Sequence, residues 1–499
     1  MSDFLVDVLK NLDSYSRLIN DLKNNTSPIA TYGIIDENLA HFLYGLNVHT
    51  KRQVFLLTDN EVKARQLYED MSNLGNTNVE LFPKREVLFY DIDASSHDNL
   101  KQRLKVISNL TKEESIIVIA SLEAIIDKII IRDIFEKHKL SIQYNKDISL
   151  DLLLDTFVTS GYERVHMVEA VGQFSIRGGI IDIFPPDSQH PYRIELFDEE
   201  VDSIRTFDIL TQRSIEVIDK VIIPPVREIL ITNKIRNKVI ENLGVELGTH
   251  GQNEKTMEKF NRYMELLKED SPDINNFMIQ PYIPDRYLGS IIDYIKNNAL
   301  IFIDEPQRIM DKAQRIQEDM YLRLTDLLEV GEIMPSHFKM WYGYEDLLPK
   351  IKNKIVITNS SLLKADKNYP PKAIYNFPVK STINYHNKVD LLAEDIKHFQ
   401  YRGYKIVILS GTEDRGLRLQ KDLYEFGITS TFSKNRKGEI KSGQLFITVG
   451  SIQSGFEYSS IKLIVITDKE IFGAQKKKMG KLRRKRDKKV LSVSDLNIG

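Results

Sequence analysis

Short runs of consecutive apolar residues, rich in β-branched side chains, constrain the fold of this chain more than any other feature. Residues 53–58, 115–120 and 300–303 are runs of this kind. Strands without polar alternation are typical of a parallel sheet that is covered on both faces. Helical periodicity over residues 60–74 follows the first run. Strand followed by helix indicates an α/β layer architecture.

The middle of the chain has a different pattern. Over residues 130–215, alternating runs are separated by a glycine pair, Gly178-Gly179, and by polar turns. This pattern predicts a small antiparallel sheet inserted into the chain. Beyond it, Leu288, Ile291, Ile292 and Ile295 recur at helical spacing. A second α/β unit is expected over residues 380–470, with strands at 405–409, 445–449 and 463–467 and helices at 389–399 and 414–426.

Composition excludes several classes of protein. With 499 residues the chain exceeds what one hydrophobic core usually supports, so several domains are expected. No apolar run approaches the roughly 18 to 20 residues that span a bilayer, so no membrane partner is expected. No signal peptide is visible at the N-terminus, and the absence of cysteine fits a cytoplasmic location. The ten histidines have no ligand-like spacing, so we expect no metal site.

The net charge of -2 hides an uneven distribution. Residues 476–489 contain ten Lys or Arg and one acid, Asp487, a net charge of +9, so the rest of the chain carries -11. An acidic body is a poor general attractor for DNA phosphates. The basic tract is expected to be a solvated linker, with a DNA-contacting tether as the alternative.

A phosphate-binding loop is expected early in such an α/β chain, and its residues are missing. The loop needs glycines for backbone approach, a lysine for charge and a hydroxyl for magnesium. In the nearest candidate, which starts at Gly33, Asn38 stands at the second glycine, Leu39 at the lysine and Ala40 at the hydroxyl position. This segment therefore predicts no nucleotide binding, and we expect no cofactor and no catalytic residue.

The acidic motif that accompanies a phosphate-binding loop in motor ATPases is present. The apolar run at 300–303 ends in Asp304 and Glu305, where a motor ATPase would hold magnesium and activate water. The alternative is a strand that leads into a helix starting at Pro306. Without the lysine we favour this structural role, as a vestige of an ATPase site.

At this point the motifs resemble a known family, the bacterial transcription-repair coupling factors (Mfd). One match is Leu81-Phe82-Pro83-Lys84-Arg85-Glu86 with Tyr90-Asp91 and Arg103-Leu104. The stronger match begins at Gly161-Tyr162-Glu163-Arg164, includes Gly172-Gln173-Phe174-Ser175-Ile176-Arg177-Gly178-Gly179-Ile180-Ile181-Asp182-Ile183-Phe184-Pro185, and continues through 191–198, 200–205, 207–208 and 212–214. Weaker similarity covers nearly the whole chain.

The resemblance implies a fold and a function. The fold class would be α/β: a degenerate RecA/helicase-like domain split by an inserted α+β domain, then a second α/β domain. Expected limits are 1–125 (domain 1a), 126–213 (the inserted domain), 214–355 (domain 1b), 356–470 (domain 3) and 471–499 (a basic linker). The inserted domain would recruit UvrA to stalled RNA polymerase.

The resemblance also implies domains that this chain lacks. Those would bind RNA polymerase and drive an ATP- and Mg-dependent double-stranded DNA translocase, and they could contact and mask the inserted domain. An active DNA-dependent ATPase or helicase fragment of the UvrB type is the alternative, and a plain DNA-binding module is a third hypothesis. UvrB also carries a long DNA-clamping hairpin, whereas here Ile116 follows Tyr90 by only 26 positions.

Three residues are the candidate UvrA contacts by the same resemblance. They are Arg164, Arg177 and Phe184. Arginine suits such an interface because its planar guanidinium group binds carboxylates in a bidentate manner. For Arg177 the alternative is an ordinary solvent-facing arginine. Phe184 is weighed equally as a core residue and as an interface anchor.

Overall fold

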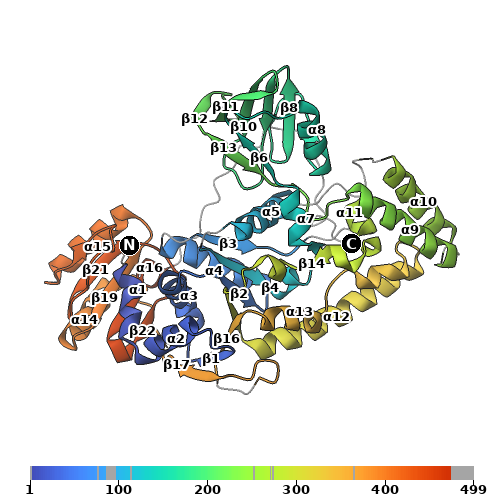
Figure 1. Ribbon diagram of the computed structural model, residues 1–499. Coiled ribbons are helices and arrows are strands. Elements are labelled where there is room, and N and C mark those ends of the chain that lie inside the picture. Colours follow the sequence, from blue (N-terminus) through green and yellow to red (C-terminus); the bar gives the residue numbers. More distant parts are fainter. Residues whose placement is uncertain are drawn as a thin grey trace, which may run out of the picture.

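A seven-stranded parallel sheet forms the centre of the largest unit (Figure 1). The computed structural model describes residues 3–75, 78–85, 97–112, 115–250, 253–269, 271, 275–362 and 366–473. All neighbouring strands in this sheet are parallel. In spatial order they are β17 (Ala373–Asn376), β1 (Ile29–Tyr32), β16 (Ile355–Ser360), β15 (Leu300–Asp304), β2 (Val54–Thr58), β4 (Ile117–Ser121) and β3 (Val79–Phe82).

Both faces of this sheet are buried, as the unbroken apolar runs predict. Along β2, Val54 and Leu56 belong to one hydrophobic core, whereas Phe55 and Leu57 belong to another. The principal helices around the sheet are α3 (Asp36–Thr50), α4 (Glu61–Leu74), α5 (His97–Thr111), α9 (Asn233–His250), α10 (Glu254–Lys268), α12 (Pro306–Glu329) and α13 (Tyr344–Lys352).

The predicted antiparallel insert is confirmed and projects from the main sheet (Figure 1). Its six-stranded sheet has the order β12 (Ser214–Val217), β11 (Glu200–Phe207), β10 (Tyr192–Phe197), β9 (Ile180–Ile183), β8 (Gln173–Arg177) and β7 (Glu163–Arg164). Only the β7–β8 pair is parallel. The hairpin β6 (Leu140–Gln143)–β13 (Lys220–Ile223) and α8 (Leu150–Thr159) complete its core.

Strand pairing places the limits of the insert later in the chain than 126 and 213. Residues 129–130 form β5, which pairs with β14 (Leu288–Gly289) outside the insert. The pairing of β6 with β13 extends the inserted unit over residues 140–223. A similar shift applies to domain 3, because β16 and β17 both belong to the main sheet and the second sheet starts only after Asn376.

The helix expected from Leu288 to Ile295 is wrong. The chain forms the short strand β14 and then the 3-10 turn η4 (Ile291–Tyr294). All four apolar residues are buried, so their spacing reflects burial on all sides. Asp293 caps the turn by accepting a hydrogen bond from Ser290 N at 2.8 Å, and the Tyr294 hydroxyl donates to Ile130 O at 2.6 Å.

The second α/β unit is confirmed. Its six-stranded sheet has the order β18 (Lys380–Ser381), β22 (Phe456–Tyr458), β23 (Leu463–Thr467), β19 (Lys405–Ser410), β21 (Leu445–Val449) and β20 (Thr431–Phe432). The central strands are parallel, and β18 and β22 are antiparallel to their neighbours. The helices are α14 (Val389–Tyr401), α15 (Glu413–Glu425) and α16 (Asp468–Phe472).

The N-terminal helices join the two α/β units. The rings of Phe4 in α1 (Phe4–Asp7) and Phe446 in β21 meet edge to face, with centroids 4.7 Å apart. One hydrophobic core includes α1, α2 (Asp13–Lys23), α3 and strands of both sheets. In Figure 1 the N-terminus lies beside the second unit. The two units are therefore packed as one body.

A buried ion cluster fixes the exit of the insert. Arg103 on α5 donates through Nε to Glu228 Oε1 at 2.6 Å, and Arg85 donates through Nη2 to Glu228 Oε2 at 2.7 Å. Arg103 also forms an ion pair with Asp127 at 3.1 Å. Arg85 and Arg103 come from the family-like motif, and Glu228 follows the last strand of the insert. The motif thus holds the insert against the main sheet.

None of the described helices has the length and apolar character needed to span a bilayer. Within the described ranges, no group of three or more His, Asp or Glu side chains could hold a metal ion. The basic tract and the motif residues Tyr90 and Asp91 lie outside the described residues.

Candidate functional site

The outer face of the inserted sheet carries a row of charged side chains. Strand register places Arg177, Asp182, Arg193 and Arg205 opposite one another or diagonally across β8, β9, β10 and β11. Because side chains alternate along a strand, residues such as Phe174 and Ile194 point to the core instead. The face is therefore polar and rich in arginine.

Asp182 organises this row. Its side chain is 1% exposed, and it accepts bonds from Arg193 Nε at 2.7 Å and Nη2 at 2.9 Å. Arg177 Nη2 also donates to it at 3.0 Å, although the Arg177 side chain is 54% exposed. Bonding to Asp182 is the largest of the effects that raise the pKa of Arg193. One buried carboxylate therefore holds two guanidinium groups, of which Arg177 is the more exposed, at 54% against 18% for Arg193.

The glycine pair forms the tight turn between β8 and β9. A Cβ atom on Gly179 would lie 2.6 Å from Leu196 O, so only glycine allows this approach of β10. Gly178 has φ +61° and open space around it. The turn leaves Arg177 uncovered at the end of the sheet.

The other two predicted contacts lie in different surroundings. Arg164 is exposed on β7, the strand that pairs with β8. Phe184 is 9% exposed, and Lys101 Nζ on α5 lies 5.8 Å from its ring centroid. This burial favours the core interpretation of Phe184. As UvrA contacts, Arg164, Arg177 and Phe184 remain predictions.

Sequence reasoning missed several residues of this face. Arg193 and Arg205 were part of the quoted motif but were not singled out. Their strand alternation with Glu195 and Ser203 was the available signal. Phe197, at the same end of the sheet as the Gly178–Gly179 turn, is 79% exposed. Phe197 therefore presents an aromatic side chain to solvent, whereas Phe184 does not.

The segment that replaces the phosphate loop is closed. Gly33 has φ +85°, and a Cβ atom there would lie 2.8 Å from Phe377 O. The amide of Asn38 accepts from Ile35 N at 2.8 Å and donates to the hydroxyl of Tyr458, on the second unit, at 2.8 Å. Leu39 and Ala40 are buried in the core shared by the two units.

Lys63 forms ion pairs with two acids beside this segment. From α4, its Nζ reaches Asp304 Oδ2 at 2.5 Å and Asp36 Oδ1 at 2.6 Å. Burial raises the pKa of Asp304, and the Lys63 ammonium opposes this shift. Asn359 Nδ2 also donates to Asp304 at 3.0 Å. An internal ammonium thus neutralises the acid at the end of β15.

Glu305 is also engaged. It has φ +51° and precedes α12, which begins at Pro306 as the structural interpretation predicts. Its Oε1 accepts from Ser361 N at 2.8 Å and from the Ser361 hydroxyl. Both bonds are to Oε1, and they hold this carboxylate against the residue that follows β16.

Comparisons with known proteins agree with this arrangement. Residues 140–228 match the UvrB interaction domain. The chain is 30% identical over 506 residues to the transcription-repair-coupling factor of Bacillus subtilis (strain 168), covering 100% of this chain and 43% of that protein. It is 29% identical to the same factor of Staphylococcus haemolyticus (strain JCSC1435), covering 96% of this chain and 40% of that protein.

Among solved structures, an XPD helicase aligns with 9% identity and a TM-score of 0.23, over 89% of this chain and 81% of that one. The fold assignment rests on the sheet topology described above and not on this weak likeness. The chain spans about two-fifths of the length of the relatives that it matches. Along its whole length the chain is therefore similar to transcription-repair-coupling factors, and residues 140–228 match the interaction domain.

Proposed function

We propose that this chain recruits UvrA through the outer face of its inserted sheet, as the N-terminal part of a coupling factor. Arg177 and Arg193, which Asp182 holds, together with Arg205, which pairs with Glu195, carry this proposal. Guanidinium groups that are fixed before binding lose little side-chain entropy, and they suit carboxylates on a partner. Contacts with RNA polymerase and double-stranded DNA, and ATP-driven translocation, belong to the rest of the longer protein. The cytoplasm is the proposed location.

We further propose that this part of the protein neither binds nor hydrolyses ATP. The Lys63 bridge, the buried Leu39 and Ala40, and the engaged Glu305 support this proposal, since each removes one requirement of a nucleotide site. They also weigh against an active ATPase or helicase fragment. The inserted unit then has recruitment as its role.

Charge removal at Arg177 tests the recruitment proposal. Loss of one partner of a buried interfacial charge pair typically costs roughly 2 to 5 kcal/mol, so Arg177→Glu should weaken UvrA binding at least about thirtyfold. The reversal places a carboxylate near Asp182, so Arg177→Ala should be measured beside it. Arg193 still neutralises Asp182 in both variants. Their melting temperatures should therefore stay close to that of the parent chain.

Arg262→Glu, on the exposed side of α10, is the matched control and should bind UvrA normally. Arg164→Glu tests the neighbouring strand in the same titration. If both Arg177 variants bind UvrA like the parent chain while remaining folded, this face is not the interface. If Arg177→Ala unfolds the insert, the arginine is structural.

A further inference from the structure

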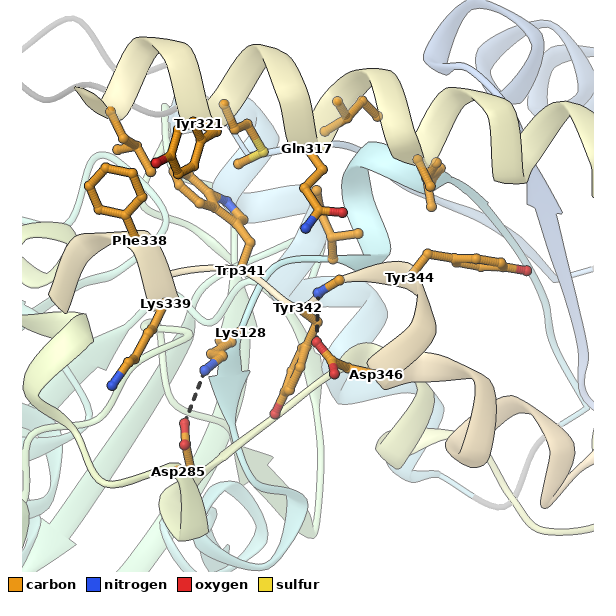
Figure 2. A pocket seen from close by; sticks show the side chains of 17 residues that line it. Lys128, Asp285, Gln317, Tyr321, Phe338, Lys339, Trp341, Tyr342, Tyr344 and Asp346 are labelled. Atoms are coloured by element: carbon orange, nitrogen blue, oxygen red, sulfur yellow. Dashed lines mark hydrogen bonds and ion pairs between the residues drawn. The ribbon is translucent and has the colours of Figure 1, made fainter. Parts of the chain in front are cut away.

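An aromatic cavity of about 590 Å³ lies away from both sites described above (Figure 2). One wall is the face of α12 that presents Ala313, Ile316 and Met320. Trp341 and Tyr342, between η5 (Pro335–Lys339) and α13, also line it, and Figure 2 shows the Trp341 indole beneath α12 beside Tyr321. Cavities of roughly 300 to 1,000 Å³ with apolar and aromatic walls are typical of small-molecule sites. The cavity is large enough for a ligand of two or three fused or linked rings.

Charged groups at one end of the cavity define the chemistry of a ligand. Lys128 Nζ lies 3.0 Å from Asp285 Oδ1 and 5.1 Å from the ring centroid of Tyr342. The Lys128 side chain is 9% exposed, whereas that of Asp285 is 83% exposed. Lys339 also lines this cavity. A buried cation is therefore neutralised mainly by an acid that stands in solvent and can be replaced by another anion.

The remaining acid of the lining is engaged elsewhere. Asp346 accepts from the backbone N–H of Gly343 at 2.9 Å, at the start of α13, as the dashed line in Figure 2 shows. Lys350 Nζ lies 5.1 Å from the ring centroid of Tyr342 and adds a further cation nearby, although Asp293 partners it at 2.6 Å. The charge that is available to a ligand is thus positive and lies near Lys128.

We propose that this cavity binds a planar aromatic anion. The rings of the ligand lie against the Ala313–Met320 face of α12 and the indole of Trp341, and its anionic group takes the place of Asp285 on Lys128. Stacking on aromatic side chains and a charge-assisted hydrogen bond both favour such a ligand. Exchange of one carboxylate partner for another anion leaves the buried ammonium neutralised throughout.

A pair of fluorescent probes tests the proposal on the unaltered chain. Anilinonaphthalenesulfonate is a planar aromatic anion, and phenylnaphthylamine has the same rings without the sulfonate. Trp341 is the only tryptophan of the chain, so energy transfer from its indole reports binding within the Förster distance of this cavity, and the variants below test whether the cavity itself is occupied. We expect saturable transfer to the sulfonate and binding of the neutral probe at least about tenfold weaker, since a hydrogen bond to a charged group is lost.

Variants test the contributions of the Lys128 cation and of the apolar wall separately. Lys128→Met should weaken sulfonate binding about tenfold and leave the neutral probe unchanged. Ala313→Phe fills the space beside α12 and should weaken both probes. Lys268→Met, on α10 outside the lining, should change neither. Melting curves establish that the variants are folded.

Two results overturn the proposal without depending on any variant. The first is the absence of saturable energy transfer in the parent chain. The second is equal affinity for the sulfonate and the neutral probe, since the anion then has no role. Unchanged binding of both probes to folded Ala313→Phe would also overturn it, because the probes would then bind elsewhere.

Discussion

Lys63→Met tests whether an internal ammonium group stabilises the acid at the end of β15. The Lys63 side chain is 16% exposed, that of Asp304 is 4% exposed, and that of Asp36 is 73% exposed. Removing one partner of a buried ion pair costs about 3 to 5 kcal/mol, whereas an exposed pair contributes at most about 1 kcal/mol. Asn359 still donates to Asp304, so we expect about 3 kcal/mol.

Thermal melting measures this loss. At no more than about 2 to 4 °C per kcal/mol, the range for units of about 150 to 250 residues, the melting temperature should fall by at most about 6 to 12 °C. A second replacement, Asp304→Asn in the Lys63→Met background, removes the unneutralised carboxyl and should restore most of the loss. Since burial raises the pKa of Asp304, the deficit of the single variant should shrink as the pH falls and this carboxyl takes up a proton.

Arg65→Met is the matched control on the same helix. Arg65 pairs with Glu61 but its side chain is 48% exposed, so its loss should cost no more than about 1 kcal/mol. If Lys63→Met and Arg65→Met lower the melting temperature equally, the Lys63–Asp304 bridge does not stabilise the fold. Failure of Asp304→Asn to rescue Lys63→Met would show that the loss comes from packing of the lysine chain.

Three further predictions follow from the structure. Calorimetric titration with Mg-ATP should detect no binding, and micromolar binding would refute the closed site. Burial raises the pKa of Asp70 to about 7 from 3.8. The free energy of unfolding of the parent chain, measured relative to that of Asp70→Asn, should therefore be highest below pH 4 and decrease by up to about 4 kcal/mol as the pH rises to about 7. Parallel curves of unfolding free energy against pH for the two proteins would contradict this. Gly179→Ala should lower the melting temperature, because its Cβ would lie 2.6 Å from Leu196 O, while Gly178→Asn at φ +61° should be tolerated; equal melting temperatures would contradict the close approach.

Local patterns predicted most of the elements. The runs at 53–58 and 300–303 became β2 and β15, and the helix expected at 60–74 is α4 with Asn60 as its N-cap. These predictions succeeded because burial on both faces of a strand, and capping of a helix, depend on residues adjacent in sequence. Where apolar residues are buried on every side, as at 288–295, periodicity no longer separates a helix from a turn.

The face of the insert was partly predictable. The resemblance singled out Arg177, and the structure adds Arg193 and Arg205 from strand register. Register depends on which strands pair, and the motif alone does not give that. The burial of Phe184, whose ring centroid lies 5.8 Å from Lys101 Nζ on α5, also depends on how the insert lies against the main unit.

The α/β class, the antiparallel insert and the absence of the phosphate-loop residues could be inferred from the sequence, because each depends on residues that are adjacent in the chain. What occupies the place of the missing site became visible only in the folded chain. Lys63 meets Asp304, and Asn38 meets Tyr458, although each pair is separated by more than two hundred residues of sequence. The same is true of the cavity around Trp341, whose walls come from segments more than a hundred residues apart. Partners of a buried charge are chosen by packing in space, so spacing along the chain does not reveal them.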